Sequence, residues 1–309
     1  MTKGENEMDT SSDYKDLCVI IRSTGERTEG ICKYSIMRDD VSDNQIHFIR
    51  NIRPFSKCLK TGYELAIDLN KKYTCFIDAD CIMLPNALSL IINLMSILPK
   101  NSFVMTTLMY DYLTGRIVPG GPHLYRTEYL REAVMLIPNE NISLRPESST
   151  LKKMHQKGFE SIYLEFPAAV HSLGQYYRDI FRAAMNKRYK TSGINLLKRF
   201  ELLKSTNKDF EIAYLAVSDS MKNNTKLKLD YQQFVDEFNN YGIAEKDDID
   251  DVETAYNSLL SDFDKDSYEL YGYTNIFLKR LANKNENRFF TYLTNVAVKL
   301  MEIFYKRGR

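Results

Sequence analysis

The sequence lacks an apolar run long enough to cross a bilayer, and its longest candidate, residues 87–98, is interrupted by polar side chains. Residues 1–16 are polar and acidic and lack the positive-then-apolar pattern of a secretory signal, so we expect a disordered tail. The 42 Lys and Arg nearly balance the 41 Asp and Glu, which provides no electrostatic case for nucleic-acid binding. We therefore expect a soluble, cytoplasmic protein without a nucleic-acid partner.

Cysteine is also scarce. The five cysteines form an odd set without a CxxC pair or zinc-site spacing, and three of them lie in or beside predicted strands. Free cysteine in such places behaves as a small buried apolar residue. This usage favours a reducing compartment over a disulfide framework.

Proline and cysteine are both absent from residues 191–309, whereas residues 17–190 contain all eight prolines. The earlier part alternates short β-like runs with helical patterns, and the later part is rich in Lys, Asn, Asp, Leu and Tyr at helical spacing. We predict an α/β domain over residues 17–190, with a mostly parallel sheet flanked by helices, followed by an all-α domain over residues 191–309.

The most informative segment is residues 73–85, where an apolar run ends at Asp78 and Asp80 and a helix start follows near Pro85. Open α/β sheets bind ligands at the carboxyl ends of their strands. In an extended chain, side chains two residues apart point to the same side, so both carboxylates can face one divalent cation. The alternative is a strand-end turn with two solvated aspartates.

The segments around this motif alternate between the two-residue apolar period of strands and the 3.6-residue period of helices. Strands are expected at residues 17–24, 45–50, 102–112 and 162–166, and helices after Thr28 and over residues 56–70. The order strand–helix–strand–helix–strand up to Asp78 implies parallel pairing. Residues 120–123, which contain two adjacent glycines, read as a tight loop near a ligand.

This ordered set resembles the family 2 glycosyltransferases with the GT-A fold, over residues 17–190. The residues that carry the resemblance are Val19-Ile20-Ile21, the Lys-containing helix with Gly62, Phe76-Ile77-Asp78-Ala79-Asp80, Gly120-Gly121-Pro122-His123-Leu124-Tyr125-Arg126, the helix that ends at Gly158, and His171. The family pattern also has an aspartate after the second strand that grips the base. Here Arg50-Asn51 stands at that place, so the base stays open.

The resemblance implies roles for particular residues. Asp78 and Asp80 would hold Mn²⁺ or Mg²⁺ on the diphosphate of a nucleotide-sugar, and His171 would complete the metal site. Glu147 would be the base that takes the proton of the acceptor hydroxyl, although it follows Pro146 instead of forming the usual Glu-Asp pair. The loop residues expected to contact the nucleotide are Thr24, Glu26 and Arg27.

Other roles rest on chemistry and spacing. Asp111 is the alternative base, and Glu147 could instead be a first-turn acid that stabilises its helix. Arg178 and Arg182 share a helix face, where they could meet donor phosphates or an anionic acceptor, or simply be solvated.

Together with the resemblance, the sequence predicts a metal-dependent, inverting glycosyltransferase that moves a sugar from a nucleotide-diphosphate donor to a hydroxyl group of a glycan or lipid-linked acceptor. By analogy with the family alone, we expect a role in surface polysaccharide or lipopolysaccharide synthesis. The alternatives are a nucleotidyl or sugar-phosphate transferase and a non-catalytic assembly protein. The last helical segment, residues 274–307, is aromatic-rich and precedes a basic end. It could contact the inner face of the plasma membrane, pack on its own domain, or mediate oligomer formation.

Overall fold

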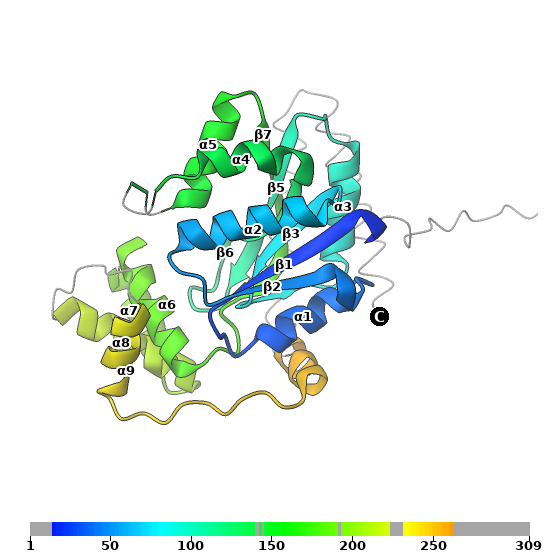
Figure 1. Cartoon of the computed structure of the whole chain (residues 1–309). Coiled ribbons are helices and arrows are strands. Elements are labelled where there is room, and N and C mark those ends of the chain that lie inside the picture. The colour runs from blue at the N-terminus through cyan, green and yellow to red at the C-terminus, as the bar shows by residue number, and fades with distance from the viewer. Residues whose placement is uncertain (1–13, 140–141, 144, 191–192, 223–230, 262–309) are drawn as a thin grey trace, which may run out of the picture.

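The computed structural model describes residues 14–139, 142–143, 145–190, 193–222 and 231–261. Its centre is a seven-stranded sheet in the order β2-β1-β3-β6-β5-β7-β4 (Figure 1). In chain order the strands are β1 (Leu17–Ser23), β2 (Ile46–Arg50), β3 (Tyr73–Asp78), β4 (Cys81–Met83), β5 (Ser102–Asp111), β6 (Arg116–Arg126) and β7 (Glu160–His171).

The sheet is mostly parallel. Strand β1 pairs in parallel with β2 and β3, and β5 pairs in parallel with β7. Strands β4 and β6 run the other way, because each of their pairings is antiparallel. The predicted α/β class with a mostly parallel sheet flanked by helices is confirmed.

Helices cover both faces of the sheet. On one face, α1 (Glu29–Met37) and α3 (Ala87–Ile97) pack on alternate β1 residues such as Val19 and Ile21. On the other face, α2 (Phe55–Leu69), α4 (Leu130–Leu136) and α5 (Pro146–Gln156) pack around Ile20 and Phe76. Burial of one such aliphatic side chain contributes about 1.5–3 kcal/mol, so the two clusters fix the sheet between its helical layers.

The remaining helices form a separate apolar cluster. Helix α6 (Tyr177–Lys190) packs with α7 (Gly193–Leu203), α8 (Lys208–Lys222) and α9 (Tyr231–Asn239), and Leu113 from the β5–β6 turn joins them (Figure 1). By packing, α6 therefore belongs with the helices that follow it. Residues 252–261 are helical again and lie against α1, where Tyr256 and Ile31 are both buried.

One local prediction is wrong. Gly120 and Gly121 lie within strand β6 and do not form a loop. Their φ angles of 138° and 101° are ones that only glycine adopts without strain, and they occur where the pairing of β5 with β6 slips between Thr106 and Leu108. A bulge, which sequence reasoning cannot distinguish from a turn, accounts for the two glycines.

Some predictions lie outside the described residues, namely most of the amino-terminal tail and the segment 274–307. Within the described part, residues 14–16 form a short turn before β1, and Tyr14 is buried. No helix in that part is both long and apolar enough to span a membrane.

Helix α3 receives its amino-terminal cap from a distant residue. Its N-cap residue, Asn86, makes no side-chain cap bond. Instead, Asp39 accepts hydrogen bonds from the backbone N–H of Asn86 at 2.6 Å and of Leu88 at 2.9 Å. Burial raises the pKa of Asp39 to about 6 even though these two donors oppose the shift.

This raised pKa predicts a pH-dependent stability. Because the folded chain binds this proton more tightly than the unfolded chain, the contribution of Asp39 is full below about pH 4 and is lost as the pH rises through 6. Relative to Asp39→Asn, the wild type should therefore lose stability between pH 4 and 7, which urea unfolding at several pH values would measure. The exposed Asp68→Asn variant is the control, and an equal slope for both variants would contradict the assignment.

Candidate functional site

The carboxyl ends of β1, β3, β5 and β7 meet at one edge of the sheet and gather the charged residues of the candidate site. Arg22 stands opposite Asp78 in the β1–β3 register, and Asp111 stands opposite His171 in the β5–β7 register. The turn after β3 brings Asp80 to the same edge, where its carbonyl accepts a hydrogen bond from the N–H of Ser172. Parallel pairing places these strand ends together although they are far apart in sequence.

The first cluster centres on the buried guanidinium of Arg22. Its Nε donates to Oδ1 of Asp78 at 2.7 Å, and its Nη1 lies 3.4 Å from Oε1 of Glu147. Arg22 has the same strand parity as Ile20 and so faces the side covered by α2, α4 and α5. Burial opposes the charge, yet the two carboxylates raise the pKa of Arg22 well above its usual value.

Glu147 enters this cluster from the first turn of α5, which begins at Pro146. Its Oε1 accepts a hydrogen bond from the Tyr125 hydroxyl at 3.0 Å, and its Oε2 lies 3.9 Å from Nε2 of His123. Burial alone would raise the pKa of Glu147, but Arg22, His123 and Tyr125 hold it below the usual value. Glu147 is therefore a mostly buried carboxylate that stays ionised at neutral pH.

The second cluster joins Asp80, His171 and Asp111. Oδ2 of Asp80 lies 3.2 Å from Nε2 of His171, and Nδ1 of the same ring lies 3.3 Å from Oδ2 of Asp111. Burial opposes the charge of His171, but the two carboxylates raise its pKa to about 9. Although burial opposes its ionisation too, Asp80 has a pKa lowered to about 2, mainly by His171.

Asp111 uses both of its oxygens within the protein. Oδ1 accepts hydrogen bonds from the N–H and the hydroxyl of Thr114, at 2.9 and 3.0 Å. Oδ2 accepts from Lys187 of α6 and faces His171. In this structure Asp111 therefore ties the β5–β6 turn and α6 to His171. Its alternative role as a base stays a prediction.

Asp78 and Asp80 do not share one direction. The expectation of parallel carboxylates depended on an extended chain, but β3 ends at Asp78 and the chain turns at Ala79 and Asp80. Asp78 pairs with Arg22, and Asp80 pairs with His171. Within the described ranges, no three His, Cys, Asp or Glu side chains are gathered into a group that could hold a metal ion.

The loop after β1 is held by its own hydrogen bonds. Oε2 of Glu26 accepts from the N–H of Thr24 at 2.6 Å, and Oε1 accepts from the Thr24 hydroxyl at 2.7 Å. Arg27 points elsewhere and donates to the carbonyls of Asp247 at 2.7 Å and Gly174 at 2.9 Å. Arg27 thus links the loop after β1 to Gly174 and Asp247. Contact of Thr24, Glu26 and Arg27 with a nucleotide stays a prediction.

The basic residues of α6 contact different acidic partners. Arg178 lies over the ring of Tyr176, 4.0 Å from its centroid, and 3.8 Å from Oε2 of Glu245. Arg182 lies 3.7 Å from Oδ1 of Asp179. Lys187 is the α6 cation that reaches the Asp111 carboxylate. A phosphate contact by Arg178 stays a prediction.

Sequence reasoning missed two members of the site, Arg22 and Lys187. A signal for Arg22 was present, because an arginine that follows Val19-Ile20-Ile21 in a buried strand requires carboxylate partners. Lys187 gave no such signal, because it is one of several basic residues on α6. Only the packing of α6 decides that Lys187 is the one that reaches Asp111.

The Arg22 cluster predicts a strong energetic coupling. Arg22→Met should lower the free energy of unfolding by about 3 kcal/mol, because it leaves the buried Glu147 without its cation. In Arg22→Met/Glu147→Gln the loss should be smaller than the sum of the single losses by about 1 kcal/mol or more. Urea unfolding of the four proteins measures this cycle.

The matched control is the pair of Arg50 with Glu29, whose Nη2 and Oε1 atoms are 2.9 Å apart. Arg50 is half exposed, so Arg50→Met should cost no more than about 1 kcal/mol. A coupling energy below about 0.5 kcal/mol between Arg22 and Glu147 would contradict the assigned role of Arg22.

Comparison with known proteins gives partial structural likenesses. No family model and no curated sequence matches the chain. Among solved structures, it is similar to a glycosyltransferase involved in glycosylation of the major capsid of PBCV-1, at 10% identity, a TM-score of 0.35, and coverage of 50% of this chain and 92% of that one.

Two further similar structures are a synthase and a synthetase. One is 4-diphosphocytidyl-2C-methyl-D-erythritol synthase from Anaerococcus prevotii, at 9% identity and a TM-score of 0.38, covering 48% of this chain and 88% of that one. The other is CMP:2-keto-3-deoxy-manno-octonic acid synthetase in complex with CTP, at 9% identity and a TM-score of 0.34, covering 50% and 90%. Identities of 9–10% do not assign a reaction to this chain.

Proposed function

We propose that the chain is a metal-dependent transferase that binds a nucleotide-diphosphate sugar and passes the sugar, with inversion, to a hydroxyl group of a glycan or lipid-linked acceptor. The observation that supports this most is the pair of adjoining clusters at one sheet edge. One contains Asp80 and His171, and once a cation displaces the Nε2 proton of His171, this nitrogen and the Asp80 oxygen are suitable metal ligands. The other contains Glu147, an ionised and nearly buried carboxylate.

The donor set fits a divalent cation that arrives with its substrate. Asp80 and His171 supply one carboxylate and one imidazole, while Asp78 and Asp111 are engaged by Arg22 and Lys187. Mg²⁺ is commonly held by one or two carboxylates and completed by substrate phosphates and water. Bound there, Mn²⁺ or Mg²⁺ would stabilise negative charge on the departing diphosphate as a Lewis acid.

Glu147 is suited to act as the general base that takes the proton of the acceptor hydroxyl group. Its carboxylate is ionised, held by Arg22 and Tyr125, and 14% exposed, so the hydroxyl group of an acceptor can reach it. Fixed hydrogen bonds keep the carboxylate in one orientation, and that favours proton transfer from a positioned hydroxyl. His123, 3.9 Å from Oε2, would support the same carboxylate.

A metal test follows from the two-ligand donor set. Mn²⁺ with a nucleoside diphosphate should raise the melting temperature, whereas either alone should do little, because neither completes the coordination. At one hundred times the dissociation constant the gain is about 2.7 kcal/mol. Asp80→Asn should abolish the joint shift and Asp68→Asn should keep it. No joint shift with any nucleoside diphosphate would refute the proposal.

The reaction class is tested by its products. With a nucleotide-sugar, a glycosyltransferase releases the nucleoside diphosphate, whereas a nucleotidyltransferase releases pyrophosphate from a nucleoside triphosphate and a sugar phosphate. Glu147→Gln should lower the turnover number about 10²–10⁴-fold and preserve the joint Mn²⁺–nucleotide shift. Pyrophosphate release, or full turnover by Glu147→Gln, would contradict the proposed mechanism.

A further inference from the structure

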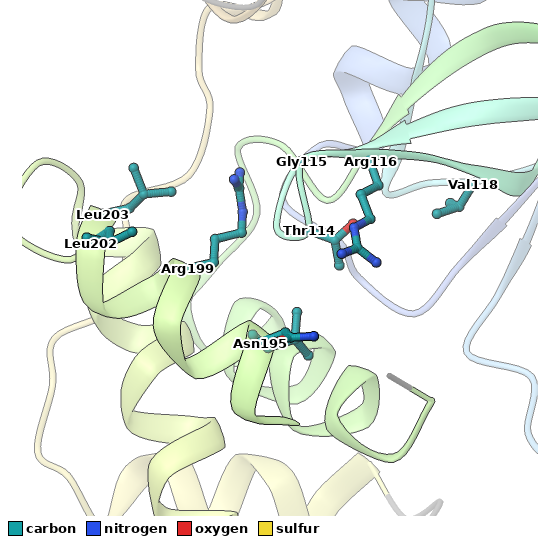
Figure 2. Close-up of a pocket in the computed structure, with 9 residues that line it drawn as sticks. Thr114, Gly115, Arg116, Val118, Asn195, Arg199, Leu202 and Leu203 are labelled. Carbon is teal, nitrogen blue, oxygen red and sulfur yellow. The ribbon is translucent and has the colours of Figure 1, made fainter. Parts of the chain in front are cut away.

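A cavity of about 510 Å³ lies between the β5–β6 turn and helix α7 (Figure 2). Such a volume is typical of sites for small molecules. Its lining is Thr114, Gly115, Arg116, Val118, Asn195, Leu196, Arg199, Leu202 and Leu203. These residues include two guanidinium groups, four aliphatic side chains and no carboxylate, so the cavity combines positive charge with an apolar wall.

Both arginines have capacity for a ligand. The side chain of Arg116 is exposed and makes no hydrogen bond or ion pair with any residue that the structure describes. Arg199 donates through Nε to the carbonyl of Leu113 at 2.9 Å, which fixes its position. Figure 2 shows Arg199 extending from α7 toward the turn at Gly115, while Arg116 extends from the turn toward α7.

Gly115 allows this close approach. Its φ is +63°, and a Cβ at this position would lie 2.6 Å from Nη2 of Arg199. Only glycine both adopts this backbone conformation without strain and leaves room for the guanidinium. The planar guanidinium groups of Arg116 and Arg199 suit the oxygens of a phosphate or carboxylate.

The apolar part of the cavity continues to the surface. Asn195, Arg199 and Leu202 follow one another at i, i+4 and i+7, so they line one face of α7. Leu202 is 77% exposed and Ile194, at the start of the same helix, is 58% exposed. If the two arginines bind an anion that carries an aliphatic chain, this chain would leave the cavity across Leu202 and cover its exposed side chain.

One lining residue of the cavity is also hydrogen-bonded to a residue of the candidate site. Thr114, in its wall, donates two hydrogen bonds to Oδ1 of Asp111, and Oδ2 of Asp111 faces His171. We propose that this cavity binds an anionic amphiphile, namely the phosphate-linked aliphatic chain of a lipid-linked acceptor, whose glycan hydroxyl group receives the transferred sugar. The acceptor role rests on the proposed transferase function, whereas binding of the amphiphile does not.

The test measures binding of decyl phosphate, below its micelle concentration, to the full chain by calorimetry. Arg116→Gln should weaken binding about tenfold, because it removes a cation that binds the phosphate. Leu202→Ser should weaken binding about fivefold, because it removes an apolar contact with the aliphatic chain. The matched controls, Arg131→Gln and Met135→Ser, change exposed residues of α4 and should leave the affinity within twofold of wild type. All four substitutions are at exposed positions, so equal melting temperatures are expected.

Several results would overturn the proposal. These are equal affinity for decyl maltoside or for inorganic phosphate, an unchanged affinity in Arg116→Gln, and binding only to vesicles that contain phosphatidic acid. The Mn²⁺–nucleotide melting shift, measured in the same preparations, separates the two proposals. If that shift persists without decyl phosphate binding, only the cavity assignment fails. If decyl phosphate binds without that shift, the acceptor role fails with the transferase.

Discussion

The buried guanidinium of Arg22 constrains the whole edge of the sheet where the candidate site lies. Removing an arginine from water costs several kcal/mol unless carboxylates surround it. Two do so here, Asp78 from the neighbouring strand and Glu147 from the first turn of α5. Because both must be present, the pairing of β1 with β3 and the docking of α5 depend on one cation. The same ion pairs hold Glu147 ionised in a place where burial would favour its protonation.

A second balance of charges links the sheet to the helices that follow it. Asp80 and Asp111 are two carboxylates at the ends of different strands, and His171 lies between them. Lys187 then connects Asp111 to α6, which packs with α7, α8 and α9. The helical part is thereby attached to the candidate site itself, through Asp111 and through the turn at Thr114. Through this attachment, Thr114 in the wall of the cavity beside α7 is hydrogen-bonded to Asp111 of the candidate site.

Much of the framework was predictable because it depends on local patterns. Continuous apolar runs predicted the buried strands β1 and β3, and their order with the intervening helices predicted parallel pairing. The sequence also predicts the end of β3 at the aspartates and the position of Glu147 in the first turn of a helix. The two glycines of β6 were misread as a loop, because a bulge and a turn demand the same positive φ. Sequence reasoning also missed the divergence of Asp78 and Asp80, which depends on where the chain turns.

The sequence by itself determined the class of fold and the residue types available at the sheet edge, since apolar periodicity and strand-end carboxylates are properties of short segments. Only the tertiary structure decided which charges meet. Arg22 pairs with Asp78 and Glu147, and His171 pairs with Asp80 and Asp111, over sequence separations of 56 to 125 residues. The register of parallel strands and the packing of α5 and α6 fix these partners, and no local pattern encodes them. The cavity between Arg116 and Arg199 arises in the same way, because its two walls come from a turn and a helix that meet only in the folded chain.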